Sequence, residues 1–200
     1  MRDVRYGDRT LGCALLALTP LLLVGCGGAD DDPGTKATTA GAVLPTLITP
    51  DSAGEWNRVT TDAAQDNAEA YLIRAQEEAE PGMTPLFAEY ARDDGSTLAY
   101  LGFNVDPTSA YAEQLEDTPE VAVDITLANA GIEDRQALDA GDLGGALACG
   151  TLPEEYGVDG LTCAWADETT SAQVTLVVPE LDYDEAAELT LAFREAVTDR

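Results

Sequence analysis

Few residues of this chain can carry covalent or metal chemistry. The chain has four cysteines and no histidine. Without histidine, Ser-His-Asp and Cys-His catalysis and histidine-ligated zinc or haem sites are excluded. The sequence contains no G-x-G-x-x-G, no G-x-x-x-x-G-K-[ST] and no D-x-[DN]-x-[DN]-G, so dinucleotide, P-loop and EF-hand sites are not expected. We therefore expect no cofactor and no metal site.

Carboxylates are the reactive groups that remain. Asp and Glu total 38 against 10 Lys and Arg, for a formal net charge of −28. Glycosidases need only two carboxyl groups at a suitable separation, and so many acids give no means of choosing a pair. No catalytic residue is assigned. A non-enzymatic binding module is the expected function, and a carboxylate-based hydrolase acting on envelope glycans and a divalent-cation binder stay open as alternatives.

The negative charge also constrains the partners. A strongly acidic surface repels phosphate backbones, which argues against nucleic-acid binding, and it opposes docking on anionic lipid. It attracts a basic protein or a cationic ligand, or it serves only as a soluble exterior.

The first 25 residues have the pattern of a signal peptide. Three arginines occur among the first nine residues, and Leu11–Val24 is uncharged. Fourteen residues reach only about 21 Å as a helix, short of the roughly 30 Å hydrocarbon core, so a permanent transmembrane helix is disfavoured.

This segment ends in Leu23-Val24-Gly25-Cys26, which resembles the bacterial lipoprotein lipobox. The resemblance implies cleavage before Cys26, acylation of Cys26, and a protein held by lipid on the outer face of the cell membrane. An ordinary secretory signal with a cysteine at this position by chance is the alternative. The expected organisation is a signal peptide over 1–25, an acylated N-terminus and tether over 26–48, and a globular domain over 49–200.

The remaining cysteines have separate expected fates. Cys13 leaves with the signal peptide, so Cys149 and Cys163 are the only two in the domain. Outside the cytoplasm such a pair favours a disulfide. The spacing does not suit a C-x-x-C redox site, and zinc requires more ligands.

The domain alternates helix-type and strand-type patterns. Helices are expected in three segments: 62–80, 106–117 and 183–198. In these segments apolar residues recur at helical spacing, or short runs match helix signals. Strands are expected in six segments: 84–92, 96–105, 120–129, 144–152, 161–167 and 171–178. Asp93-Asp94-Gly95 predicts a hairpin turn, and Asp182 with Glu185 predicts the start of the last helix.

These elements predict an α+β fold, with an antiparallel sheet and two or three helices packed on one face. The segments 86–116 and 145–198 share a strands-then-helix order, which suggests a weak internal repeat.

The C-terminal third is similar to uncharacterised secreted or membrane-anchored actinobacterial proteins. It shares a Gly-Gly-x3-Cys segment, a Cys-x-Trp-x-Asp segment and an arginine on the final helix, at Gly144, Gly145, Cys149, Cys163, Trp165, Asp167 and Arg194. The resemblance implies an extracytoplasmic compartment and a disulfide, and no activity.

Two features of this segment have alternative interpretations. Trp165 and Asp167 either form an exposed binding pair, or Trp165 packs over the disulfide in the core. Gly144 and Gly145 form either a backbone anion nest or a tight turn before a strand. Arg194 is expected to pair with a carboxylate.

Overall fold

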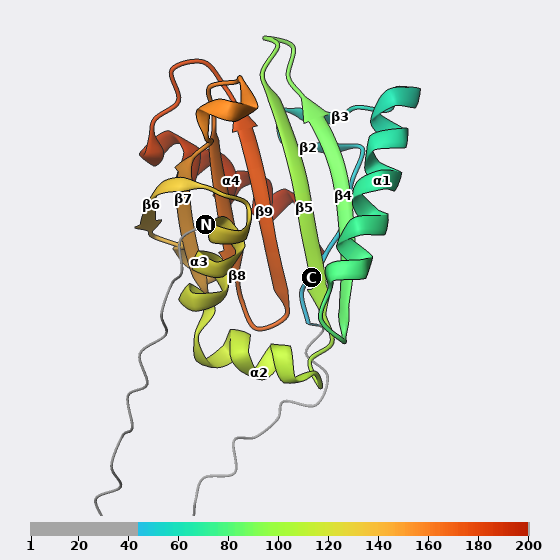
Figure 1. Cartoon of the computed structure of the whole chain (residues 1–200), viewed down its shortest axis with the longest axis vertical. Helices are drawn as coiled ribbons and strands as arrows, with labels where there is room; N and C mark the ends of the chain where they lie inside the picture. The colour runs from blue at the N-terminus through green and yellow to red at the C-terminus, as the bar shows by residue number, and fades with distance from the viewer. Residues whose placement is uncertain (1–43, 200) are drawn as a thin grey trace, which may run out of the picture. The chain divides into compact units, whose positions relative to one another are not determined.

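The computed structural model describes residues 44–199 (Figure 1). The predicted signal peptide, Cys26 and most of the predicted tether lie outside the described residues. Within residues 44–199, no helix combines the length and the apolar character needed to cross a membrane.

The core of the fold is an antiparallel sheet in the order β2-β3-β4-β5-β9-β8-β7-β6. Its strands are β2 (Ser52–Ala53), β3 (Trp56–Arg58), β4 (Met83–Ala91), β5 (Thr97–Val105), β6 (Glu133–Leu138), β7 (Ala146–Thr151), β8 (Leu161–Ala166) and β9 (Thr170–Val177). A separate pair joins β1 (Thr46–Leu47) to β10 (Thr198–Asp199).

The order of strands follows from two simple units. β4 and β5 form a long hairpin, and β6 to β9 form a meander whose last strand returns to pair with β5. The hairpin turn has the predicted chemistry. Gly95 has a φ of +89°, and the Asp94 carboxylate accepts a hydrogen bond from the Ser96 amide at 2.9 Å. This hydrogen bond holds the pKa of Asp94 below its usual value.

In the part of the chain that the structure describes, four α-helices accompany the sheet: α1 (Asp62–Glu78), α2 (Ala110–Asp117), α3 (Pro119–Asn129) and α4 (Tyr183–Val197). Short 3-10 turns lie at η1 (Gly141–Leu143) and η2 (Glu154–Tyr156). The side chains of Thr61, Ser109 and Asp182 cap the N-termini of α1, α2 and α4 by accepting a backbone N–H three residues on. The N-cap predicted at Asp182 is confirmed.

The expected α+β class and antiparallel sheet are confirmed, and α1, α2 and α3 lie on one face. Phe87, which stacks on Tyr71 of α1, lies in register through β5 and β9 with Ala164, which packs under α3. Helix α4 covers the opposite face, where the larger core forms (Figure 1). Local sequence patterns do not predict this division, because an amphipathic stripe does not determine which face of a sheet the helix will cover.

The strand predicted over 120–129 is wrong, because this segment is helix α3. Its β-branched residues, among them Val121 and Ile125, suggested a strand. However, Pro119 occupies the first turn, where its missing N–H costs nothing, and the buried residues Val123 and Leu127 are one turn apart. The helix buries one side and leaves Val121 and Ile125 exposed.

The folded domain begins before residue 49, where the sequence analysis placed its start. Leu47 is 2% exposed and exchanges two hydrogen bonds with the Asn104 side chain, at 2.6 and 3.0 Å. Pro45 is also fixed, because its carbonyl accepts the Thr169 hydroxyl at 3.1 Å. The last residues assigned to the tether, 44–48, therefore belong to the domain.

The expected strands-then-helix order does recur in 86–116 and 145–198. The two helices pack differently, since Leu115 of α2 belongs to the core under α3 and Phe193 of α4 to the core on the other face. The two segments therefore share the order of their elements, but their helices pack differently.

Candidate ligand-binding site

Arg194 of α4 is a buried cation that ties three segments together. Its side chain is 2% exposed, and its guanidinium lies 2.8 Å from an Asp167 carboxylate oxygen. The same group donates to the carbonyls of Gly144 at 3.0 Å and Leu143 at 3.5 Å. Helix α4 is thereby fixed to the turn after β8 and to the loop before β7. The expectation that Arg194 pairs with a carboxylate is confirmed.

Asp167 is the acceptor at the centre of this arrangement. One carboxylate oxygen accepts from the amides of Thr169 at 3.0 Å and Thr170 at 2.8 Å. The other accepts from the Thr170 hydroxyl at 2.7 Å and from Arg194. Its charge is therefore largely satisfied by the protein itself. Asp167 positions the β8–β9 turn and offers little free charge to a ligand.

The two glycines before β7 have backbone conformations that other residues rarely adopt. Gly144 and Gly145 have φ values of +68° and +78°. A Cβ at Gly145 would lie 2.0 Å from the Ala166 carbonyl oxygen, whereas a Cβ at Gly144 would meet nothing within 4 Å. The positive φ values and the close approach of Gly145 to Ala166 agree with the tight-turn interpretation. The nearby carbonyls also accept hydrogen bonds from a cation, Arg194, which does not favour an anion nest.

Trp165 belongs to the core. It is fully buried and lies parallel to Tyr100, with ring centroids 6.2 Å apart, while Phe193 of α4 meets Tyr100 edge to face at 5.2 Å. Burial raises the pKa of the Tyr100 phenol, and neighbouring Tyr90 raises it further. Trp165 therefore packs between the sheet and α4, and it cannot serve as an exposed binding aromatic.

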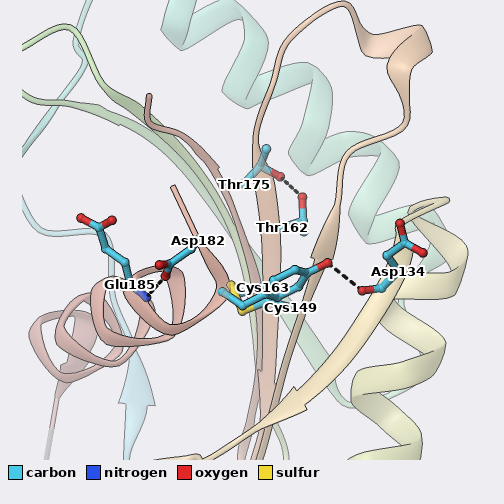
Figure 2. Close-up of a disulfide and its surroundings, with 8 residues drawn as sticks. Asp134, Cys149, Thr162, Cys163, Thr175, Asp182 and Glu185 are labelled. Carbon is cyan, nitrogen blue, oxygen red and sulfur yellow. Dashed lines mark hydrogen bonds between the residues drawn. A yellow bond between two sulfur atoms is a disulfide. The ribbon is translucent and has the colours of Figure 1, made fainter. Parts of the chain in front are cut away.

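The disulfide expected between Cys149 and Cys163 is present (Figure 2). The two cysteines are directly opposite on β7 and β8, and both are fully buried. Tyr183, at the start of α4, packs against the same core cluster and donates its hydroxyl to the Asp134 carbonyl at 2.7 Å. The disulfide therefore belongs to the core between the sheet and α4.

Replacing Cys149 and Cys163 together with alanine is expected to lower the free energy of unfolding by about 2–4 kcal/mol, because the cross-link constrains the unfolded chain. Urea unfolding of the oxidised wild-type domain and the double variant measures the difference. Equal midpoints with equal slopes would contradict a structural role for the disulfide.

Next to this network the surface forms a cavity of about 560 Å³ that is widely open to solvent. Five segments line it: the start of the described chain, the end of α2, the start of α3, the loop before β7 and the β8–β9 turn. Its lining residues are Leu44, Pro45, Leu115, Glu116, Asp117, Pro119, Glu120, Leu143, Gly144, Gly145, Asp167, Glu168 and Thr169. Its volume lies in the range of small-ligand sites.

Acidic and apolar residues both line the cavity. Asp117, Glu120 and Glu168 are exposed, and no Lys or Arg occurs among the described residues that line the cavity. Leu44 and Pro45 supply apolar surface beside them, with Leu44 42% exposed. Carboxylates beside apolar groups suit a ligand that combines a positive charge with an apolar part.

Part of this site was predicted from the sequence. Gly144, Gly145 and Asp167, which the resemblance singled out, line the cavity, and Arg194 contacts both segments that contribute them. Glu120 and Glu168 were missed, because single acids among many give no local signal. Leu44 was missed because it was assigned to the tether.

Among residues 44–199, no group of three His, Cys, Asp or Glu side chains is arranged to hold a metal ion. No family model, curated protein or solved structure matches the chain. The fold and the acidic cavity therefore define the protein only as an α+β domain with a candidate ligand-binding site.

Proposed function

We propose that this protein is an extracytoplasmic lipoprotein, anchored through Cys26 to the outer face of the cell membrane, whose domain binds a cationic partner. The acidic and apolar cavity beside Asp167 and Arg194 is the observation that carries the binding function. Nucleic acid is not a partner under this proposal, since the formal net charge is −28.

The lipobox supports the anchor. Two or more acyl chains at Cys26 suffice for stable attachment, since each buried CH₂ contributes about 0.8 kcal/mol. The eighteen peptide units from Cys26 to Leu44 span at most about 60 Å when fully extended. The anchor would therefore keep the cavity within about that distance of the membrane.

The anchor is tested by replacing Cys26 with serine. The wild-type protein is expected in the detergent phase after phase separation, and the C26S protein in the aqueous phase. Recovery of C26S in the detergent phase would contradict acylation at this residue.

The cavity is tested with spermine as a cationic probe, measured by calorimetry at low salt. Replacing Asp117 with Asn and Glu168 with Gln is expected to weaken binding about two- to thirtyfold, since each exposed charge pair contributes about 0.2–1 kcal/mol. Both residues lie at exposed element ends, so the fold should tolerate the change.

The matched control removes the same two charges from α1, which does not line the cavity. Asp66→Asn with Glu77→Gln alters two exposed residues and should leave spermine affinity nearly unchanged. Equal weakening by both double variants would mean that the net charge binds the probe, and the proposed site would be wrong.

A further inference from the structure

Helix α3 presents an unusual exposed surface next to the cavity. Val121 and Ile125 are 48% and 47% exposed, whereas Ala122, Val123 and Leu127 of the same helix are buried. The two exposed residues are four apart, so they are neighbours on one side of the helix. They form a small apolar strip that no described residue covers.

The helix that carries this strip has its first residues at the cavity. Pro119 and Glu120, at the start of α3, line the cavity, and Val121 is the next residue. Ile125 continues the strip one turn further from the cavity. A ligand confined to the cavity would leave the strip exposed to water, whereas a longer ligand could cover both.

The charges at the cavity determine what such a ligand must carry. Asp167 is satisfied by Arg194 and the threonines of its turn, and the other carboxylates that line the cavity include those of Asp117, Glu120 and Glu168. These are exposed carboxylates, which favour lysine or arginine over a neutral group.

We propose that the partner is a basic, amphipathic segment of another protein. This inference rests on the function proposed above. The segment places a lysine or arginine in the cavity and lays apolar side chains on Val121 and Ile125. Charge complementarity selects the basic partner, and the apolar strip selects a polypeptide over a small polyamine.

The test uses three probes on the whole folded domain: spermine, a lysine–leucine peptide, and a lysine–serine peptide of the same length and charge. The wild-type protein is expected to bind the lysine–leucine peptide about tenfold more tightly than the lysine–serine peptide. Val121→Ser with Ile125→Ser should abolish this preference and leave spermine binding unchanged. Serine resembles valine and isoleucine in helix propensity, so α3 should persist.

A control removes two exposed apolar residues elsewhere, Ile73 on α1 and Val158 in the β7–β8 loop, by substitution with serine. This variant should keep the tenfold preference. If the wild-type protein binds both peptides equally, or if the control loses the preference as well, the inference is overturned while cationic binding stands. If none of the three basic probes binds, the proposed function itself fails.

Discussion

Replacing Arg194 with methionine is expected to lower the free energy of unfolding by about 3–5 kcal/mol. The guanidinium is 2% exposed and contacts Asp167, Gly144 and Leu143. Breaking a buried ion pair from one side leaves the partner charge without its counter-charge, which costs more than the pair itself contributes. Two carbonyls also lose a donor.

Urea unfolding of the two proteins at neutral pH measures this effect. Arg74→Met is the matched control, because Arg74 forms an exposed pair with Glu78 on α1 and should cost less than about 0.5 kcal/mol. Lysine at position 194 keeps the charge and loses the fork of donors, so R194K should fall between wild type and R194M. Similar stabilities for R194M and R74M would show that the buried network contributes little.

The second large effect is expected at Gly145. Alanine there should destabilise the protein by about 3–5 kcal/mol, because a Cβ would lie 2.0 Å from the Ala166 carbonyl oxygen in addition to the cost of a positive φ. The neighbour is backbone of β8, which cannot move without disturbing its pairing with β7.

Gly144 provides the control for backbone strain alone. It has φ +68° and ψ −172°, a region that essentially only glycine occupies, but its Cβ position is open. Gly144→Ala should therefore cost about 1–3 kcal/mol. Thermal or urea unfolding of both variants separates the two contributions. A Gly145→Ala protein no less stable than Gly144→Ala would mean that the close approach to Ala166 is unimportant.

The sequence predicted the elements whose determining residues lie close together in the chain. The β4–β5 hairpin follows from alternation around Asp94-Gly95, and α4 follows from its stripe and the cap at Asp182. Helix α3 was mistaken for a strand because β-branched residues outweighed helical spacing. Its burial beneath a sheet, which decides its state, is a tertiary effect that propensity does not contain.

The features of the candidate site also divide into those that the sequence predicted and those that depend on tertiary packing. The disulfide and the pairing of Arg194 were predicted, since few residues could make them. The cavity was not, because its residues come from three distant parts of the chain: Leu44, the α2–α3 junction with Asp117 and Glu120, and Glu168. Only the packing of α2 and α3 beside the β8–β9 turn brings their side chains to one place.

The position of the binding site is the central claim, and a ¹⁵N NMR titration of the domain with the lysine–leucine peptide tests it most directly. The proposal predicts that the largest shift changes occur at the amides of Gly144, Gly145, Glu168 and Val121, with little change along α1. Shift changes that centre on the acidic surface of α1, or that spread evenly over all exposed acids, would contradict it.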